Sequence, residues 1–218
     1  MTPRMWRYLS PANAPRADNS IEFHVRAVDG GWLSPALVYG TGKGDVVRIG
    51  APVGGGLTLD PASGRDLLMI AGGTGLAPLR ALVEQLGQVH HQRVAYLFVG
   101  ARTASELYDL AALERLREQH RWLSVVPVVA RGPGPGPGPG DVAEVAVAHR
   151  NWTDHEIYVC GNDDMVARSL AALGTVGIDP AIVRVETYTY AGPRAGRAPA
   201  EPGTSDPARA AEGSEAHA

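Results

Sequence analysis

The segment "DLLMIAGGTGLAPLRAL" constrains the fold most, because it predicts a buried strand, a glycine turn and a helix in immediate succession. Three glycines follow the apolar run, at Gly72, Gly73 and Gly75. They allow a tight turn and let a pyrophosphate approach without a Cβ in the way. The start of the next helix directs free N–H groups at such an anion. A turn without a ligand is the alternative, since Ala77 and Pro78 replace the third glycine of the dinucleotide fingerprint.

The rest of the second half repeats this alternation of strands and helices, which predicts a parallel sheet with helices on both faces. The strand-like runs are "RVAYLFVGA", "LSVVPVVA", "HEIYVCG" and "AIVRVETY". A short helix is predicted from Val142 to His149. The "GPGPGPG" run before it predicts a solvent-exposed loop at the sheet's edge, because proline lacks an N–H donor and glycine costs backbone entropy. We therefore expect a nucleotide-binding α/β domain over residues 65–190.

The first 64 residues follow another pattern. Short β-type runs, "MWRYLS", "IEFHVRAV" and "DVVRIGAPVG", are separated by glycines and prolines, and this is typical of antiparallel sheets and barrels. One helix is predicted from Leu33 to Tyr39. Residues 191–218 contain no large apolar side chain, so they predict a disordered tail. The predicted units are residues 1–64, 65–190 and 191–218.

Composition excludes several classes of protein. The formal net charge is -3, so no broad basic surface invites nucleic acid or anionic membrane. No apolar run approaches the roughly 18 residues of a membrane-spanning helix. The single cysteine, Cys160, excludes an internal disulfide and any multi-cysteine metal site, and no histidine arrangement suggests a metal. We expect a cytoplasmic protein.

Cys160 falls at the carboxyl end of the strand "HEIYVCG". The carboxyl ends of parallel strands share one edge of a sheet, and ligands bind along that edge in open α/β folds. Cys160 is therefore predicted to lie near the glycine turn. A small cysteine that only fills the core is the alternative.

Six blocks in this order resemble the ferredoxin–NADP reductase superfamily, above all the FAD- and NAD(P)-binding modules of flavohaemoglobins and bacterial oxygenase systems. The blocks are "RYLSPANAP", "FHVRAVDGGWLS", "GDVVRIGAPVG", "AGGTGLAPLRAL", "VGARTASELYDL" and "YVCGNDDMV". The resemblance implies a partial antiparallel β-barrel flavin domain followed by an NAD(P)-binding α/β domain. It also implies an oxidoreductase that passes hydride from NAD(P)H to FAD. Electrons would then reach a haem, iron–sulfur or diiron partner, such as a globin, ferredoxin or oxygenase outside this chain.

The resemblance also implies a set of site residues. Ser10, near flavin N5, and Cys160, against the nicotinamide, are the implied catalytic residues. The implied FAD-binding residues are Arg7, Tyr8, Leu9, Ser10, His24, Val25, Arg26, Gly31, Trp32, Leu33, Ser34 and Tyr188. The implied NAD(P)-binding residues are Gly72, Gly73, Thr74, Gly75, Leu76, Pro78, Arg102, Cys160, Gly161 and Met165.

The chain departs from the family pattern in three places. Leu9 stands where the family usually has tyrosine, and Gly161-Asn162 replaces a Gly-Pro pair. Only six residues precede Arg7, where the family has about three strands. We therefore expect an incomplete barrel, from a fragment or a start codon placed too late. A nucleotide-binding remnant that cannot hold FAD is the alternative function, and a regulatory subunit with a similar body is a second one.

Overall fold

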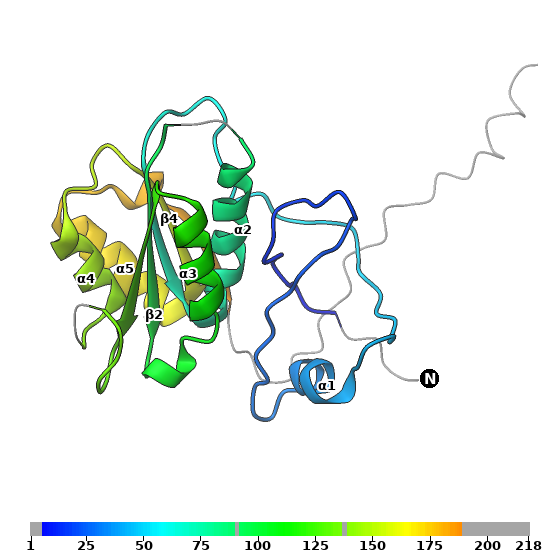
Figure 1. The fold of residues 1–218 in the computed structure, drawn as a ribbon. Coiled ribbons are helices and arrows are strands. Elements are labelled where there is room, and N and C mark those ends of the chain that lie inside the picture. The colour runs from blue at the N-terminus through cyan, green and yellow to red at the C-terminus, as the bar shows by residue number, and fades with distance from the viewer. Residues whose placement is uncertain (1–5, 90–91, 137–138, 189–218) are drawn as a thin grey trace, which may run out of the picture.

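The computed structural model describes residues 6–89, 92–136 and 139–188. The second half is a five-stranded sheet whose strands pair in parallel in the order β3-β2-β1-β4-β5 (Figure 1). The strands are β1 (Leu67–Gly72), β2 (Ala95–Ala101), β3 (Leu123–Val129), β4 (Glu156–Asn162) and β5 (Arg184–Tyr188). The helices that cover the sheet are α2 (Leu76–Gly87), α3 (Leu110–Gln119), α4 (Val142–His149) and α5 (Asp163–Thr175). Short 3-10 turns occupy Gly73–Gly75, Ala104–Glu106 and Pro180–Ile182. The predicted fold class, a parallel sheet with helices packed on it, is confirmed.

The central strand β1 is buried on both faces. Leu67 and Met69 pack with α2 and α3 on one face, while Leu68 and Ile70 pack with α4 and α5 on the other. This division follows from the period of two along a strand, which sends successive side chains to opposite faces. A strand covered on both sides needs apolar residues at every position, and this explains the continuous run that marked it in the sequence.

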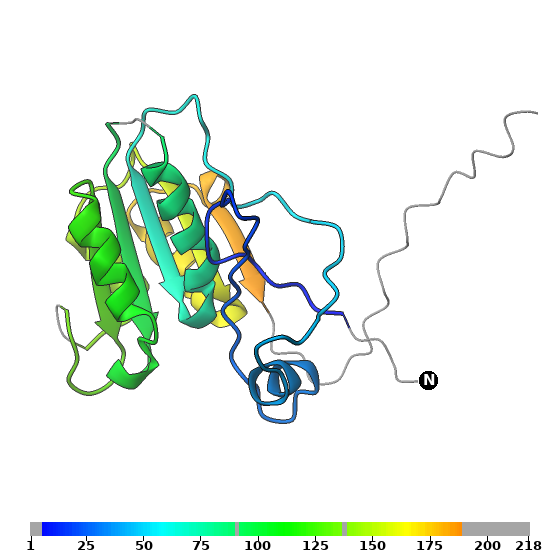
Figure 2. The ribbon, with the colours of Figure 1, turned by 45° about the vertical axis from the view of Figure 1, so that its right-hand side comes forward.

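The first part of the chain lies beside α2 and β5 (Figures 1 and 2). Its helix α1 (Leu33–Gly40) matches the predicted one. Within residues 6–66 the predicted strands form no ladder, and the bridge between Pro11 and Phe23 is the only antiparallel pairing described there. A strand needs a partner for its N–H and C=O groups, and the runs around Val46 have none in this stretch. Val46 is accordingly 94% exposed.

The proline–glycine loop follows β3 at the sheet's edge, as predicted, and its residues 131–136 are exposed. One side of the loop nevertheless contacts β3. The Gly140 N–H donates to the Val129 carbonyl at 2.9 Å, and a Cβ at Gly136 would overlap the Pro127 carbonyl. Because an uncovered edge strand invites pairing with other chains, this loop protects the edge.

Gly136→Ala is expected to lower the free energy of unfolding by about 2 kcal/mol, because the new Cβ meets Pro127 and φ is +108°. Gly132→Ala is the matched control, since its φ is also positive at +76° but a Cβ there meets nothing within 4 Å. We expect about 1 kcal/mol for the control in urea unfolding. Equal losses at both positions would contradict the contact with β3.

A buried ion pair lies at the edge of the sheet where the parallel strands begin, opposite their carboxyl ends. Arg93 donates to the Glu156 carboxylate at 2.9 Å, and both side chains are almost fully buried. The Tyr158 hydroxyl donates to the same carboxylate at 2.6 Å. Arg93 also donates to the Arg65 carbonyl, and Tyr158 lies 3.1 Å from the Thr58 carbonyl. Through Thr58 and Arg65, these contacts fix to the sheet the segment that connects the two parts of the chain.

Residues 1–5 and the predicted tail at 191–218 lie outside the described residues. Within the parts of the chain that are described, no helix has the length and apolar character needed to cross a bilayer.

Candidate active site

The glycine turn packs directly on the end of β4. Gly73 has a φ of +54°, and a Cβ at Gly75 would overlap the carbonyl of Cys160. The turn therefore requires glycine for its conformation at one position and for close approach to β4 at the other. As predicted from the strand ends, Cys160 and the glycine turn lie together.

Met165 fills the space between the ends of β1 and β4. A Cβ at either Gly72 or Gly161 would lie 2.7 Å from its Cε atom. The Asn162 side chain accepts a hydrogen bond from the Met165 N–H at 2.9 Å and caps α5. Asn162 thus gives this turn a helix cap.

Tyr188 reaches the glycine turn from β5. Its hydroxyl donates to the Gly72 carbonyl at 2.6 Å and accepts from the Gly75 N–H at 3.2 Å. The sequence prediction set Tyr188 with the flavin residues, whereas its hydroxyl lies on the predicted nucleotide turn. The turn is held in shape by this contact.

Ser10 lies against β5, because its hydroxyl donates to the Glu186 carboxylate. Glu186 is the register partner of Cys160 on the neighbouring strand, so their side chains point to the same face of the sheet. Burial raises the pKa of the Cys160 thiol above its usual range, and the charge of Glu186 raises it further. The thiol is therefore protonated at neutral pH.

Sequence reasoning missed Glu186. A signal existed, because Glu186 precedes Tyr188 by two residues and so shares its face of β5. Because the Tyr188 hydroxyl contacts the glycine turn, Glu186 also lies near the carboxyl ends of the strands. Ser10, Cys160 and Glu186 thus form one cluster, which joins the first part of the chain to the sheet.

A shallow, open hollow lies at the carboxyl edge of β1 and β2, against the glycine turn. Its apolar residues are Leu76, Val99, Leu107, Leu110 and Leu113, and its polar residues are Glu106, Tyr108 and Asp109, next to Gly73 and Gly100. Arg102, which is 75% exposed on its side chain, forms a two-point ion pair with Glu106. This pair lowers the pKa of Glu106, and the nearby charge of Arg26 lowers it further.

The remaining predicted flavin residues are spread along the first part. Tyr8 is 79% exposed, Leu9 and Trp32 are exposed, and Arg7 donates to the Trp6 carbonyl. Gly31 lies in the turn before α1, where its N–H donates to the Val28 carbonyl at 2.9 Å, and the Ser34 hydroxyl, in the first turn of α1, accepts from the Val28 N–H at 3.2 Å. Leu33 begins α1, and Val25 and Arg26 follow His24. His24 instead contacts Tyr108, with its Nδ1 atom 2.7 Å from the hydroxyl.

No group of His, Cys, Asp or Glu side chains that could hold a metal ion occurs among the described residues.

Two family models match the chain. The oxidoreductase FAD-binding domain matches residues 2–56, and the oxidoreductase NAD-binding domain matches residues 69–169. The NAD(P)H-flavin reductase of Aliivibrio fischeri is 31% identical over 165 residues, which are 73% of this chain and 70% of that protein. The chain belongs to the ferredoxin–NADP reductase superfamily.

Other members of the superfamily match over a smaller share of their length. Reductase component 1 of the terephthalate 1,2-dioxygenase of Comamonas sp. is 32% identical over 79% of this chain and 52% of that protein. The crystal structure of the Amycolatopsis cytochrome P450 reductase GcoB superposes with a TM-score of 0.71 at 31% identity, over 82% of this chain and 55% of that one. The chain thus spans about half the length of the first curated relatives it matches.

Proposed function

We propose that the chain is an FAD-dependent NAD(P)H reductase module that delivers electrons to an acceptor protein or domain. The observation that carries the proposal is the cluster of Ser10, Glu186 and Cys160, since it joins the FAD-binding part to the carboxyl edge of the NAD-binding sheet. The names of the relatives support an acceptor of the oxygenase or ferredoxin kind, because several are reductase components of oxygenases or ferredoxin–NAD(P)⁺ reductase components. A globin is the other candidate acceptor.

The chain's residues suit both nucleotides. The hollow combines the bare backbone of Gly73 and Gly100 with an apolar floor and three polar side chains, which suits one end of a dinucleotide. Tyr8 and Leu9, exposed beside Ser10, offer apolar surface to a flavin ring. Bound FAD would supply the ring that accepts a hydride from NAD(P)H and releases electrons singly.

The cluster's own work is to orient and to exclude water. Glu186 holds the Ser10 hydroxyl proton, so the serine oxygen keeps a fixed direction. Cys160 presents a neutral, buried thiol at the strand end, where it can shape the approach of a nicotinamide without adding charge. Thr74, Pro78 and the glycines would hold the dinucleotide backbone.

The test is spectroscopic. After incubation with FAD and gel filtration, the chain should retain flavin absorbance, and NADH should bleach it under nitrogen. A chain that binds NADH but retains no flavin would contradict the reductase and support the remnant. The exposed side chains around Val46 favour that alternative, since they leave the flavin part weakly packed.

We expect NADH to be preferred over NADPH, with a kcat/KM about fivefold higher or more. A 2′-phosphate of NADPH would need the Arg102 guanidinium, which is already paired with the Glu106 carboxylate. The negative charge of Glu106 would also repel that phosphate. Steady-state kinetics with both nucleotides measures this. The Glu106→Gln variant should have a smaller ratio of kcat/KM with NADH to kcat/KM with NADPH than the wild type. A wild-type kcat/KM about tenfold higher with NADPH than with NADH would contradict the role given to Glu106.

A further inference from the structure

A polar row on α2 contacts the loop at residues 11–24. Arg80 and Glu84 are four residues apart on α2, and Gln88 is its C-cap residue, another four residues along, so the three lie on one side of the helix. The Glu84 carboxylate accepts from the Ala14 N–H at 3.2 Å, and the Gln88 amide donates to the Pro15 carbonyl at 3.3 Å. Within residues 6–66, residues 12–14 are the only buried ones, so this contact fastens the first part of the chain to the sheet domain.

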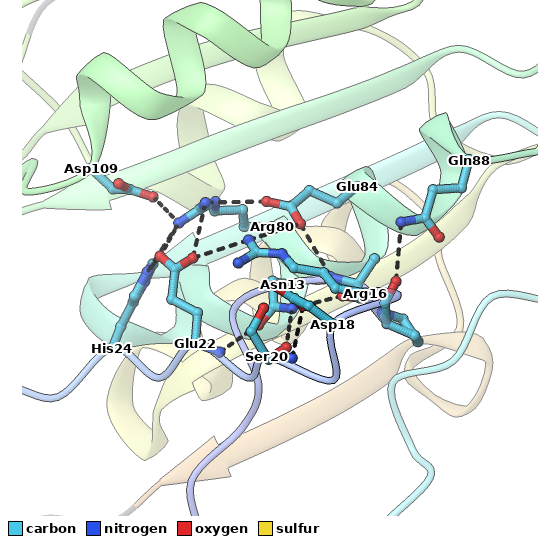
Figure 3. Close-up of polar contacts among 12 residues, drawn as sticks. Asn13, Arg16, Asp18, Ser20, Glu22, His24, Arg80, Glu84, Gln88 and Asp109 are labelled. Carbon is cyan, nitrogen blue, oxygen red and sulfur yellow. Dashed lines mark hydrogen bonds and ion pairs between the residues drawn. The ribbon is translucent and has the colours of Figure 1, made fainter. Parts of the chain in front are cut away.

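Arg80 lies at the centre of the contact, and its residue is only 9% exposed (Figure 3). Its guanidinium pairs with Glu22 at 2.7 Å, with Glu84 at 3.1 Å and with Asp109 at 3.2 Å. Burial would raise the pKa of Glu22, but hydrogen bonds from Arg80 and His24 lower it to about 2. One cation thus holds three carboxylates that come from three separate segments.

Backbone pairing connects Glu22, which Arg80 binds, to the segment that carries Ser10. The Glu22 carbonyl accepts from the Ala12 N–H at 2.8 Å, and Pro11 pairs with Phe23 in the antiparallel bridge. Ser10 immediately precedes Pro11 in the chain, and its hydroxyl donates to the Glu186 carboxylate. A shift of Glu22 would therefore move Ser10 relative to Cys160.

The same arginine reaches the hollow on its other side. Asp109 and Tyr108 both line the hollow, and the Tyr108 hydroxyl lies 2.7 Å from His24. Arg80 touches Asp109 and lies 3.1 Å from the other ring nitrogen of His24. It therefore lies between the residues of the flavin part and those of the hollow.

We propose that Arg80 is a positioning residue, which holds Ser10 against Glu186 and Cys160 and so sets the geometry of hydride transfer. The inference rests on the proposed function for its kinetic consequence. Its structural consequence, a fixed loop at residues 11–24, is independent of any bound nucleotide.

Hydrogen exchange on the chain without FAD tests the structural consequence. Arg80→Met removes the charge at similar length, and Arg80→Lys keeps the charge but cannot reach three carboxylates at once. We expect the Ala12 and Glu22 amides to exchange about tenfold faster or more in the Met variant and by a smaller factor in the Lys variant, while β1 amides stay unchanged. Arg117→Ala, which removes an exposed pair with Glu114 on α3, is the control and should change neither.

Stopped-flow reduction of the FAD-loaded variants tests the kinetic consequence. At saturating NADH, the rate should fall about tenfold in Arg80→Met and less in Arg80→Lys, with the Kd for NADH within about threefold of wild type. Should the Met variant fail to fold, the Lys variant carries both measurements.

Unchanged amide exchange would overturn the proposal, and so would faster exchange with an unchanged rate of flavin reduction. A rise in the NADH Kd that matches the fall in rate would make Arg80 a binding residue instead, which also overturns it. A wild-type chain that never reduces its flavin counts against the proposed function, and amide exchange then still decides whether Arg80 fixes the loop.

Discussion

Glu156→Gln is expected to lower the free energy of unfolding by about 3–5 kcal/mol, because it leaves the Arg93 guanidinium buried without its countercharge. The side chain keeps its shape, so the loss reports the charge rather than a cavity. Urea unfolding followed by tryptophan fluorescence and by circular dichroism measures the change, and agreement of the two probes checks that the transition is two-state.

The matched control is Glu114→Gln, which removes one partner of the exposed pair with Arg117. We expect less than about 1 kcal/mol there, because solvent screens exposed charges. The double variant Arg93→Met/Glu156→Leu should recover part of the loss, since replacing both buried charges by apolar groups removes the desolvation cost. A loss below about 1 kcal/mol for Glu156→Gln would show that water reaches the pair.

The α/β half could be predicted from the sequence because its signals are local. The continuous apolar run of β1 reflects burial on two faces, and the spacing of Leu79, Leu82, Val83 and Leu86 reflects the face of α2 that packs on the sheet. The first part could not be predicted in the same way. Its β-type runs carry the right residues, but a strand forms only with a partner, and pairing depends on segments far apart in the chain.

In the candidate site, too, local signals could be predicted, whereas contacts between distant segments could not. The sequence predicted that Cys160 meets the glycine turn, since carboxyl ends of parallel strands share an edge. Glu186 was missed because its importance depends on the register of β5 against β4. Arg80 was missed because it stands inside an ordinary helical pattern, and only the fold reveals that three carboxylates converge on it. The roles of the predicted cofactor residues stay predictions.

Cys160→Ala is expected to slow flavin reduction by NADH by about tenfold to a hundredfold, more than it weakens NADH binding. The thiol lies at the end of β4 beside Glu186, the hydrogen-bond partner of Ser10, whereas the glycine turn and the hollow offer separate contacts to the rest of a dinucleotide. A change confined to the reacting end should therefore alter the geometry of transfer while leaving affinity within about threefold.

Single-turnover reduction of the FAD-loaded chain at saturating NADH measures the rate, and a titration with NAD⁺ measures affinity. Val159→Ala is the control, because Val159 is the preceding residue of β4 and is equally buried, but it packs on the opposite face with α4 and α5. The control loses core packing without touching the cluster, so its rate should stay within about threefold of wild type. If Cys160→Ala also reduces its flavin at the wild-type rate, Cys160 only fills the core, and Ser10 with Glu186 must orient the reacting groups alone.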